Sequence, residues 1–419
     1  MTVTRLSAPA VPAYVQDALA EIDLAEPEFH TSPSQHRVFK LLRDFDPLHW
    51  NPEGAEPGFW SVTRYEDYLA VQKDTRSFSS AYTNVLGPQR WSGDEGSGRM
   101  LTHTDPPRHT DLRRLVNKAF TPRAIAKLEP YVRSVIAQSL ADAVEAGECD
   151  FVDVVSLLPV ASIAALLGVP REDWRLLLSL TTAAFGSADQ EYQAAASADS
   201  RAIAAQAHAR LLLYCQDLMR QRAADPRDDI VTCLVEARRD GQLGEEEAML
   251  FFDLLLLGGN ETTRHGAVGA LLGLMESPRE WERLRADRGM LPGAVNELLR
   301  WVSPSKHVLR RAVRDVEMHG RVIEAGQDVV VWHCSANRDH RMFPEPDLLD
   351  LGRTPNQHLA LGAGPHYCLG SALATLELRV FLDELCDRVA AGELVEPPVR
   401  LASSVISGFK HARVRLDPL

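Results

Sequence analysis

A single cysteine lies where a glycine-rich loop runs into an amphipathic helix. The loop, residues 359–370, reads LALGAGPHYCLG and carries Cys368. The next residues, SALATLELRVFLDEL, predict a helix because leucines and valines recur at steps of three and four. Backbone N–H groups of such a turn, together with the positive end of the helix, favour a thiolate over a thiol. Cys368 is therefore predicted to bind a metal ion or to act as a nucleophile.

An acidic chain of this length predicts a large globular protein that does not bind nucleic acid. The 419 residues are 45% hydrophobic and carry a formal net charge of -13, which is enough apolar material for a sizeable core. No run of clustered Lys or Arg offers an electrostatic footprint for nucleic acid. The start, MTVTRLSAPAVPAYVQDALAEI, lacks the regions of a signal peptide, and no apolar run has spanning length. We expect a cytoplasmic protein with no membrane contact.

The remaining cysteines predict no disulfide framework. They are scattered, without a CxxC pair, and are expected to be small buried thiols in a reducing compartment. A zinc site built from Cys368 and His366 would need further close ligands, and no CxxC or HxxxH partner set is present. A nucleotide-binding interpretation of the GAG in the loop also fails, because no clear strand with a downstream acidic partner accompanies it. These other cysteines are Cys149, Cys215, Cys233, Cys334 and Cys386.

The hydrophobic pattern predicts a mostly α fold with a minor β portion, in a single domain spanning residues 1–419. No linker, repeat or low-complexity tract divides the chain. Residues 1–80 mix strand-like runs such as FWSVTRYEDYLAVQ with Pro-rich turns, and residues 105–300 are mainly helical. Residues from about 302 to 335 alternate like short strands, and the helix after Cys368 is followed by a strand-like tail.

A long buried helix is predicted over FFDLLLLGGNETTRHGAVGALLGLM, residues 251–275, whose middle departs from helix rules. Gly258 and Gly259 each cost roughly 1 kcal/mol in a helix interior, and Glu261 places a carboxylate in apolar surroundings. Thr262 follows, with a hydroxyl able to bond back to the preceding turn. Two interpretations stay open: the glycines only admit a crossing helix and Glu261 pairs with a hidden base, or the segment is functional.

Further downstream, AVNELLRW places Glu297 and Arg300 three residues apart, a pattern that by itself indicates a surface ion pair.

The order of a GGxET helix, an ExxR helix, an NRD and FP segment and a GxGxHxCxG loop resembles the cytochrome P450 family of haem-thiolate monooxygenases, of the soluble bacterial type. The resemblance runs from about Asp105 to the C-terminus. One departure is Leu361, where the family usually has Phe; it is expected to weaken a packing contact and to shift the redox potential.

The resemblance implies haem b as the cofactor, in a triangular helical fold with a small β-rich region. Cys368 would be the axial ligand of the iron, and Gly362, Gly364 and Gly370 would let the backbone approach the macrocycle. In DPPRHTDLRRLV, Asp105 is predicted to cap a helix whose first residue is Pro106, which sets the next His and Arg one turn apart. By resemblance, the haem propionates would be bound by His109, Arg113, Arg310 and His366.

The resemblance also assigns roles on both sides of the haem. Glu261 and Thr262 match an acid–alcohol pair that relays protons during oxygen activation, and Gly258 and Gly259 would make room for dioxygen. The expected substrate-lining residues are Leu254, Leu257, Gly258, Lys306 and Val308. Glu297, Arg300 and Arg353 would form a structural ion-pair core.

The function implied is a monooxygenase that uses O2 and NAD(P)H electrons, delivered by a ferredoxin and a ferredoxin reductase. An alternative is a haem protein that uses peroxide, rearranges its substrate or acts as a sensor. A small-molecule, secondary-metabolite substrate is expected. Its polar character is suggested by Arg90, Lys306 and His307, which favour an anionic intermediate, a carrier-protein-bound amino acid or a nucleotide-linked sugar. The electron donor is expected to dock on the basic residues Arg108, Arg114, Lys118, Arg123 and Lys127.

Overall fold

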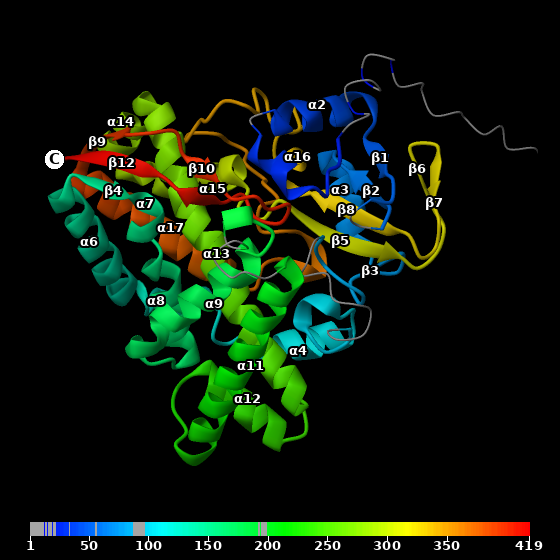
Figure 1. The fold of residues 1–419 in the computed structure, drawn as a ribbon, viewed down its shortest axis with the longest axis horizontal. Coiled ribbons are helices and arrows are strands. Elements are labelled where there is room, and N and C mark those ends of the chain that lie inside the picture. Colours follow the sequence, from blue (N-terminus) through cyan, green and yellow to red (C-terminus); the bar gives the residue numbers. More distant parts are fainter. Residues whose placement is uncertain are drawn as a thin grey trace, which may run out of the picture.

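A helix-rich part and a strand-rich part lie side by side, with one long helix running through the middle (Figure 1). The computed structural model describes residues 12, 15, 19, 22–32, 34–54, 57–86, 97–191, 193 and 199–419. The prediction of a mostly α fold with a minor β portion is confirmed. None of the described helices is both long and apolar enough to cross a membrane.

The strand-rich part combines residues 27–79 with residues 307–336. Its sheet has the order β1-β2-β8-β5-β3, in which β2 and β8 are parallel and the other neighbours antiparallel. β8, DVVVW, is buried along its whole length, as expected for a central strand covered on both faces. The elements of this part are η1 (Pro27–Thr31), α2 (Gln35–Phe45), β1 (Leu48–Asn51), β2 (Phe59–Val62), α3 (Tyr65–Lys73), β3 (Phe78–Ser79), β5 (His307–Ala312), β6 (Val316–Met318), β7 (Arg321–Ile323), β8 (Asp328–Trp332) and α16 (His333–Ala336).

The helix-rich part is organised around α13, Glu245–Glu276, which contains the predicted buried helix. Three glutamates in its first turn interact favourably with the positive end of the helix dipole and so stabilise the helix start. Glu247 also accepts a 2.7 Å hydrogen bond from the backbone N–H of Gly244. The other helices here are η2 (Leu101–His103), α4 (Arg108–Val116), α5 (Pro122–Ala126), α6 (Glu129–Ala146), α7 (Phe151–Val154), α8 (Leu157–Leu167), η3 (Arg171–Asp173), α9 (Trp174–Gly186), α11 (Ser200–Ala224), α12 (Ile230–Arg239), α14 (Pro278–Ala286), η4 (Arg288–Met290) and α15 (Leu291–Val302).

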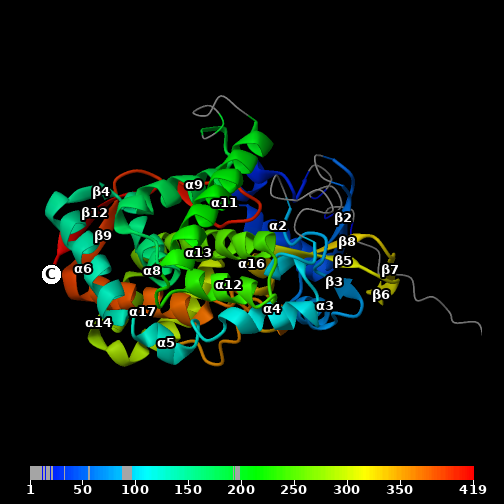
Figure 2. The same cartoon turned by 90° about the horizontal axis from the view of Figure 1, so that it is seen from below.

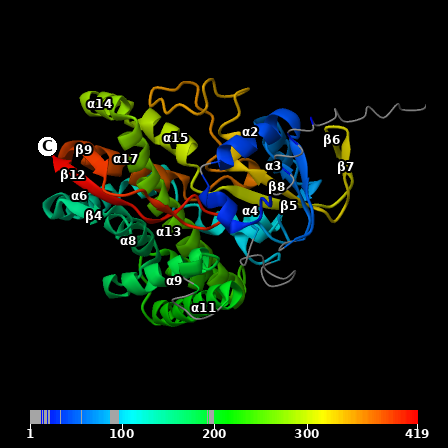
Figure 3. The ribbon, with the colours of Figure 1, turned by 45° about the horizontal axis from the view of Figure 1, so that its top comes forward.

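The helix that follows the Cys368 loop, α17 (Ser371–Arg388), lies against the underside of α13 and beside α5 (Figure 2). Its apolar residues join those of α13, α15 and α6 in the largest core cluster. Figure 3 shows α17 and α13 with the C-terminal strands beside them. The remaining elements are η5 (Gly364–His366), β4 (Glu148–Asp150), β9 (Val389–Leu394), β10 (Val399–Arg400), β11 (Phe409–His411) and β12 (Arg413–Pro418).

The predicted start of the helix after Asp105 was wrong by two residues. α4 begins at Arg108, and Asp105 does not cap it with its side chain. The Asp105 carboxylate instead accepts hydrogen bonds from the hydroxyl of Ser79 and, at 2.8 Å, from the backbone N–H of Ser80. These bonds tie the segment before α4 to β3, so a partner distant in sequence overrides the local capping pattern.

Candidate active site

A cavity of about 360 Å³ separates α13 from the Cys368 loop. Cys368, Leu361 and Gly362 line one side of it, while Gly258 and Thr262 of α13 line the other. A volume of this size is typical of a site for a small molecule or cofactor. The two sequence features that broke local rules, the cysteine loop and the middle of the buried helix, therefore face the same space.

The Cys368 loop is fixed by backbone contacts that glycine permits. The N–H of Cys368 donates to the carbonyl of Leu361 at 2.8 Å, which closes the loop. Gly364 has φ +67°, and a Cβ built on it would lie 2.5 Å from the carbonyl oxygen of Gln72 in α3. A side chain at this position would push the loop away from α3.

The thiol of Cys368 is set in apolar surroundings. Burial raises its pKa above the usual value, while a hydrogen bond from the Gly370 N–H and the charge of Arg113 act in the opposite direction. The donors expected from the sequence are therefore present, but burial outweighs them. A thiolate at this position requires a cation close to Sγ, which a metal ion supplies.

Histidine and arginine side chains gather at one part of the cavity wall. His109 and His366 have ring centroids 4.2 Å apart, and Arg310 and Arg113 line the same cavity. In the part of the chain that the structure describes, Nε2 of His109 and Nε2 of His103 are buried without a hydrogen-bond partner. Unpaired buried imidazole nitrogens beside two guanidinium groups fit a dianionic ligand, as the two propionates of haem would be.

The titration of this histidine and arginine cluster reflects its missing counter-charge. Burial, with the charges of Arg310 and neighbouring side chains, lowers the pKa of His366 to about 2. Burial and nearby cations lower the pKa of His109 and of His103 to about 4. Burial also lowers the pKa of Arg310 to about 10. Two carboxylates at this site would reverse these effects, because opposite charge favours the protonated forms.

On the opposite wall, Thr262 presents its side chain to the cavity. Its hydroxyl donates to the carbonyl of Gly258 at 2.7 Å, one turn back. Gly258 has open space where a Cβ would be, whereas the Cβ of a residue at 259 would touch Ile163 at 3.5 Å. The absence of a side chain at 258 therefore widens the cavity beside the Thr262 hydroxyl.

Glu261 lies behind this wall and does not line the cavity. Its carboxylate is buried, forms an ion pair with Arg264, lies 3.4 Å from Nε2 of His265 and accepts from the hydroxyls of Thr181 and Thr182 at 3.4 Å. Burial acts to raise the pKa of Glu261, but Arg264 and His265 outweigh it and lower the pKa. The hidden base that the sequence left open is thus Arg264, and the acid and the alcohol face different surroundings.

The predicted substrate residues divide into those that line the cavity and one that does not. Leu254, Leu257 and Val308 line it, as does Gly258. Lys306 does not: it is buried, and its Nζ donates to the carbonyl of Ser403 at 2.7 Å. The prediction that Lys306 faces substrate was wrong, because this residue precedes β5 and turns toward the C-terminal loop.

The other two polar residues suggested for substrate also offer little to it. His307 reaches the cavity wall, but both ring nitrogens are occupied, one by the carbonyl of Ser404 and one by the N–H of Leu86, each at 2.9 Å. Arg90 lies outside the described residues.

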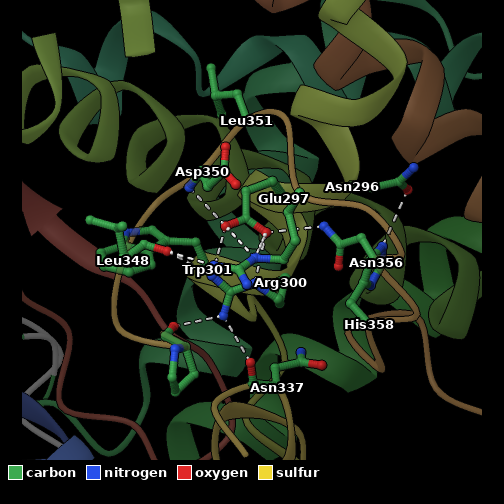
Figure 4. Close-up of polar contacts among 12 residues, drawn as sticks. Asn296, Glu297, Arg300, Trp301, Asn337, Leu348, Asp350, Leu351, Asn356 and His358 are labelled. Carbon is green, nitrogen blue, oxygen red and sulfur yellow. Dashed lines mark hydrogen bonds and ion pairs between the residues drawn. The ribbon is translucent and has the colours of Figure 1, made fainter. Parts of the chain in front are cut away.

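Glu297 and Arg300 form a fully buried pair rather than the surface pair that their spacing alone indicated (Figure 4). Arg300 Nε and Nη2 donate to the two Glu297 oxygens at 2.7 Å each. Arg353 Nε lies 3.1 Å from both oxygens, and Asn356 Nδ2 lies 3.0 Å from one. The three residues that the resemblance grouped as an ion-pair core are therefore in contact.

The ion-pair core is connected to the Cys368 loop by one asparagine. Arg300 Nη1 donates to the carbonyl of Asn337 at 2.9 Å, and the Asn337 side-chain oxygen accepts from the N–H of Leu359 at 2.7 Å. Leu359 is the first residue of the glycine-rich loop. The core thus fixes where the loop begins.

Several cavity residues escaped the analysis of the sequence. His103 lies beside the histidine and arginine cluster, and Glu377 of α17 is a buried carboxyl whose pKa burial raises to about 8. Asp253 of α13 is also buried and contacts His208 of α11. Asp253 and Glu377 each interrupt an apolar run, which is the one sequence feature that marks them as candidates.

Comparison with known proteins identifies the family. Residues 193–388 match the family model described as Cytochrome P450. Putative cytochrome P450 126 of Mycobacterium tuberculosis is 38% identical over 417 residues, covering 95% of this chain and 98% of that protein. The chain belongs to the cytochrome P450 family. All of the features assembled around Cys368 are consistent with this membership.

Two further members are similar over nearly their whole length. Linalool 8-monooxygenase of Pseudomonas putida is 34% identical, covering 94% of this chain and 99% of that one. The crystal structure of P450 OxyD, which is involved in the biosynthesis of vancomycin-type antibiotics, has a TM-score of 0.85 and 35% identity, covering 95% of this chain and 100% of that one. This cytochrome P450 is a monooxygenase that uses haem b, O2 and NAD(P)H electrons delivered through partner proteins.

Proposed function

We propose that this cytochrome P450 oxidises a secondary metabolite with electrons from a ferredoxin that a ferredoxin reductase keeps reduced. The observation that carries the proposal is the position of Cys368 and Thr262 on facing walls of one cavity. The likeness to P450 OxyD supports a role in natural-product biosynthesis. Carrier-bound and free substrates are both compatible with this role.

We assign the haem to the Cys368 side of the cavity. Cys368 would be the thiolate ligand, Gly362 and Gly370, which line the cavity beside it, would lie next to the ring, and Leu361 stands where the family usually has Phe. Haem with a thiolate ligand supplies oxygen-activating chemistry when bound. The residues assigned to its propionates are His109, Arg113, Arg310 and His366, with His103 added to the set predicted from the sequence.

Thr262 is assigned to proton transfer at its hydroxyl oxygen. That hydroxyl donates to the Gly258 carbonyl, which leaves its oxygen lone pairs to accept a hydrogen bond from the cavity side. Glu261 is assigned as the carboxylate that accepts a proton and passes it on to replace the one transferred, through rearrangement of its contacts with Arg264 and Thr182. Leu254, Leu255 and Leu257 of α13 make this wall apolar.

A basic surface on α4 and α5 supports ferredoxin docking near the Cys368 helix. Arg114, Lys118, Arg123 and Lys127 are exposed, and α5 packs against α17. Arg108, predicted to belong to this surface, is instead paired with Glu247 of α13. Arg114 lies 3.1 Å from Asp111, an exposed pair that a partner's carboxylate can replace at little cost.

The docking proposal is tested by the rate at which a reduced acidic ferredoxin reduces the purified haem protein. Arg114→Glu combined with Lys118→Glu is expected to slow that rate, and added salt is expected to slow the wild type, because screening acts over roughly 10 Å or less. Arg220→Glu, which changes an exposed arginine on another helix, α11, is the matched control. An unchanged rate in the double variant would place the docking surface elsewhere.

Substrate class is tested by titrating the haem protein with candidate metabolites and following the visible spectrum. Free and carrier-bound forms of the same acyl or aminoacyl group separate the two delivery modes. A spectral response to only the carrier-bound form assigns a carrier protein as partner, and a response to the free form alone excludes it.

A further inference from the structure

A carboxylate in the wall of the substrate cavity has one oxygen without a partner. Asp253 lies within the apolar run FFDLLLL of α13, is 0% exposed and lines the cavity. Its Oδ2 lies 2.9 Å from Nδ1 of His208 on α11. Among the described residues, its Oδ1 is buried and accepts no hydrogen bond. Such an oxygen destabilises the fold unless a ligand or water supplies a donor.

The surroundings of Asp253 separate it from the haem-binding groups. Its neighbours on α13, Leu254, Leu255 and Leu257, also line the cavity and are apolar. Glu377, the other carboxyl in the described cavity lining, belongs to α17 on the Cys368 side. The Asp253–His208 pair is therefore a polar position in the apolar, α13 side of the cavity.

The charge state of the pair restricts what can bind there. Burial alone would disfavour a charged imidazole, but the carboxylate of Asp253 and its hydrogen bond raise the pKa of His208 above its usual value. This shift favours the form of the pair in which a protonated His208 balances the charge of Asp253. A substrate cation would then be repelled by His208 and a substrate anion by Asp253, whereas a neutral hydrogen-bond donor meets neither penalty.

We propose that Asp253 Oδ1 is a substrate-binding acceptor that receives a hydrogen bond from a neutral hydroxyl or amide N–H on an otherwise apolar molecule. This inference rests on the proposed function of the same cavity. Asp253 and Thr262 are nine positions apart on α13, about 13.5 Å along the helix axis, and both line the cavity. The substrate that touches both positions is therefore elongated, with its donor group remote from the carbon that is oxidised.

The competing explanation is that the pair only fastens α11 to α13. The two explanations differ in what they predict for ligands. A fastening contact contributes to thermal stability and is indifferent to a donor on the ligand, whereas a recognition site rejects an analogue that lacks the donor.

The test is a spectral titration of the full-length haem protein with 1-dodecanol and with its methyl ether, which keeps the oxygen but lacks the donor. Wild type is expected to bind the alcohol about tenfold or more tightly than the ether, the factor that corresponds to one hydrogen bond to a charged acceptor. In Asp253→Leu, the affinity for the alcohol should fall to that for the ether. Asp217→Leu, which removes an exposed carboxylate from α11, should keep the wild-type ratio.

The proposal would be overturned if the wild type bound the two probes equally or bound neither. It would also be overturned if the ratio of the two affinities were unchanged in Asp253→Leu. A lowered unfolding temperature in Asp253→Leu with an unchanged ratio would assign the pair to fastening alone. If Asp253→Leu does not fold, the wild-type ratio alone decides. The titration needs no ferredoxin and no turnover. A negative result would therefore refute the role of Asp253 without bearing on the electron donor or the oxidation reaction, which are tested in separate assays.

Discussion

Replacing Arg300 with Met is expected to destabilise this cytochrome P450 far more than removing an exposed arginine with the same spacing to its partner. Arg300 is fully buried and makes five hydrogen bonds: two to Glu297, and three to the carbonyls of Asn337, Pro346 and Leu348. Breaking a buried pair by removing one partner costs about 3–5 kcal/mol, because the other charge stays buried. Arg353 still contacts Glu297, so we expect the lower end of this range.

The matched control is Arg220→Met on α11. Arg220 also lies three residues from its acidic partner, at 2.6 Å from Asp217, but both side chains are about two-thirds exposed, at 67% and 66%. Exposed pairs contribute about 0.2–1 kcal/mol. Arg300→Lys should fall between the two, because it keeps the charge but loses the planar fork.

The assay is urea unfolding followed by tryptophan fluorescence, with haem absorbance recorded on the same samples. Arg300→Met should lower the midpoint by several times the shift of Arg220→Met. It should also release haem earlier, because the loop from Leu359 is attached through Asn337. Similar small shifts in both variants would refute the role given to this core.

Three further changes test other parts of the site. Thr262→Ala should keep haem and substrate affinity but release more hydrogen peroxide per NAD(P)H consumed, and Thr262→Ser should restore coupling; unchanged coupling in Thr262→Ala would assign proton transfer to other groups. Glu377→Gln should flatten the pH dependence of the free energy of unfolding. Burial raises the pKa of Glu377 to about 8 from an ordinary 4.5, so ionising this carboxyl destabilises the fold increasingly as pH rises from about 4.5 to 8. The destabilisation is on the order of 4 kcal/mol at the upper end. Gly364→Ala should loosen haem retention more than Gly241→Ala, because both glycines have positive φ but only the Cβ at 364 would meet backbone, at 2.5 Å from Gln72; equal effects would show that backbone strain alone matters.

Local patterns in the sequence located the two walls of the cavity correctly. The spacing of apolar residues predicts both α13 and α17, and the glycines, Glu261 and Thr262 stand out because they oppose the helix around them. The Cys368 loop stands out because a single cysteine lies among glycines where the loop runs into a helix. Features of this kind are visible without tertiary information, since the conflict is within one segment.

The errors and omissions share a different cause, which is contact between distant segments. Lys306 was expected to face substrate because its segment resembles a substrate-lining segment of the family, yet its ammonium group reaches the carbonyl of Ser403 near the end of the chain. Asp105 matched a capping pattern, yet its carboxylate is held by Ser79 and Ser80. No sequence spacing indicates these partners.

The pairing of Asp253 with His208 has the same origin. It depends on α11 lying against α13, and the two residues are 45 positions apart in the chain. The sequence showed a lone carboxylate in an apolar run, which marks a position that needs a partner but does not identify the partner.

The central claim, that Cys368 is the thiolate ligand of a haem, is tested most directly by the absorption spectrum of the reduced, carbon monoxide-bound protein. Wild type should show the red-shifted Soret band that thiolate ligation produces, and so should Cys233→Ser, which changes an exposed cysteine. Cys368→Ser should lose that band while retaining its fold by circular dichroism. The red-shifted band persisting in Cys368→Ser, or a colourless wild-type protein that takes up no haem, would contradict the account.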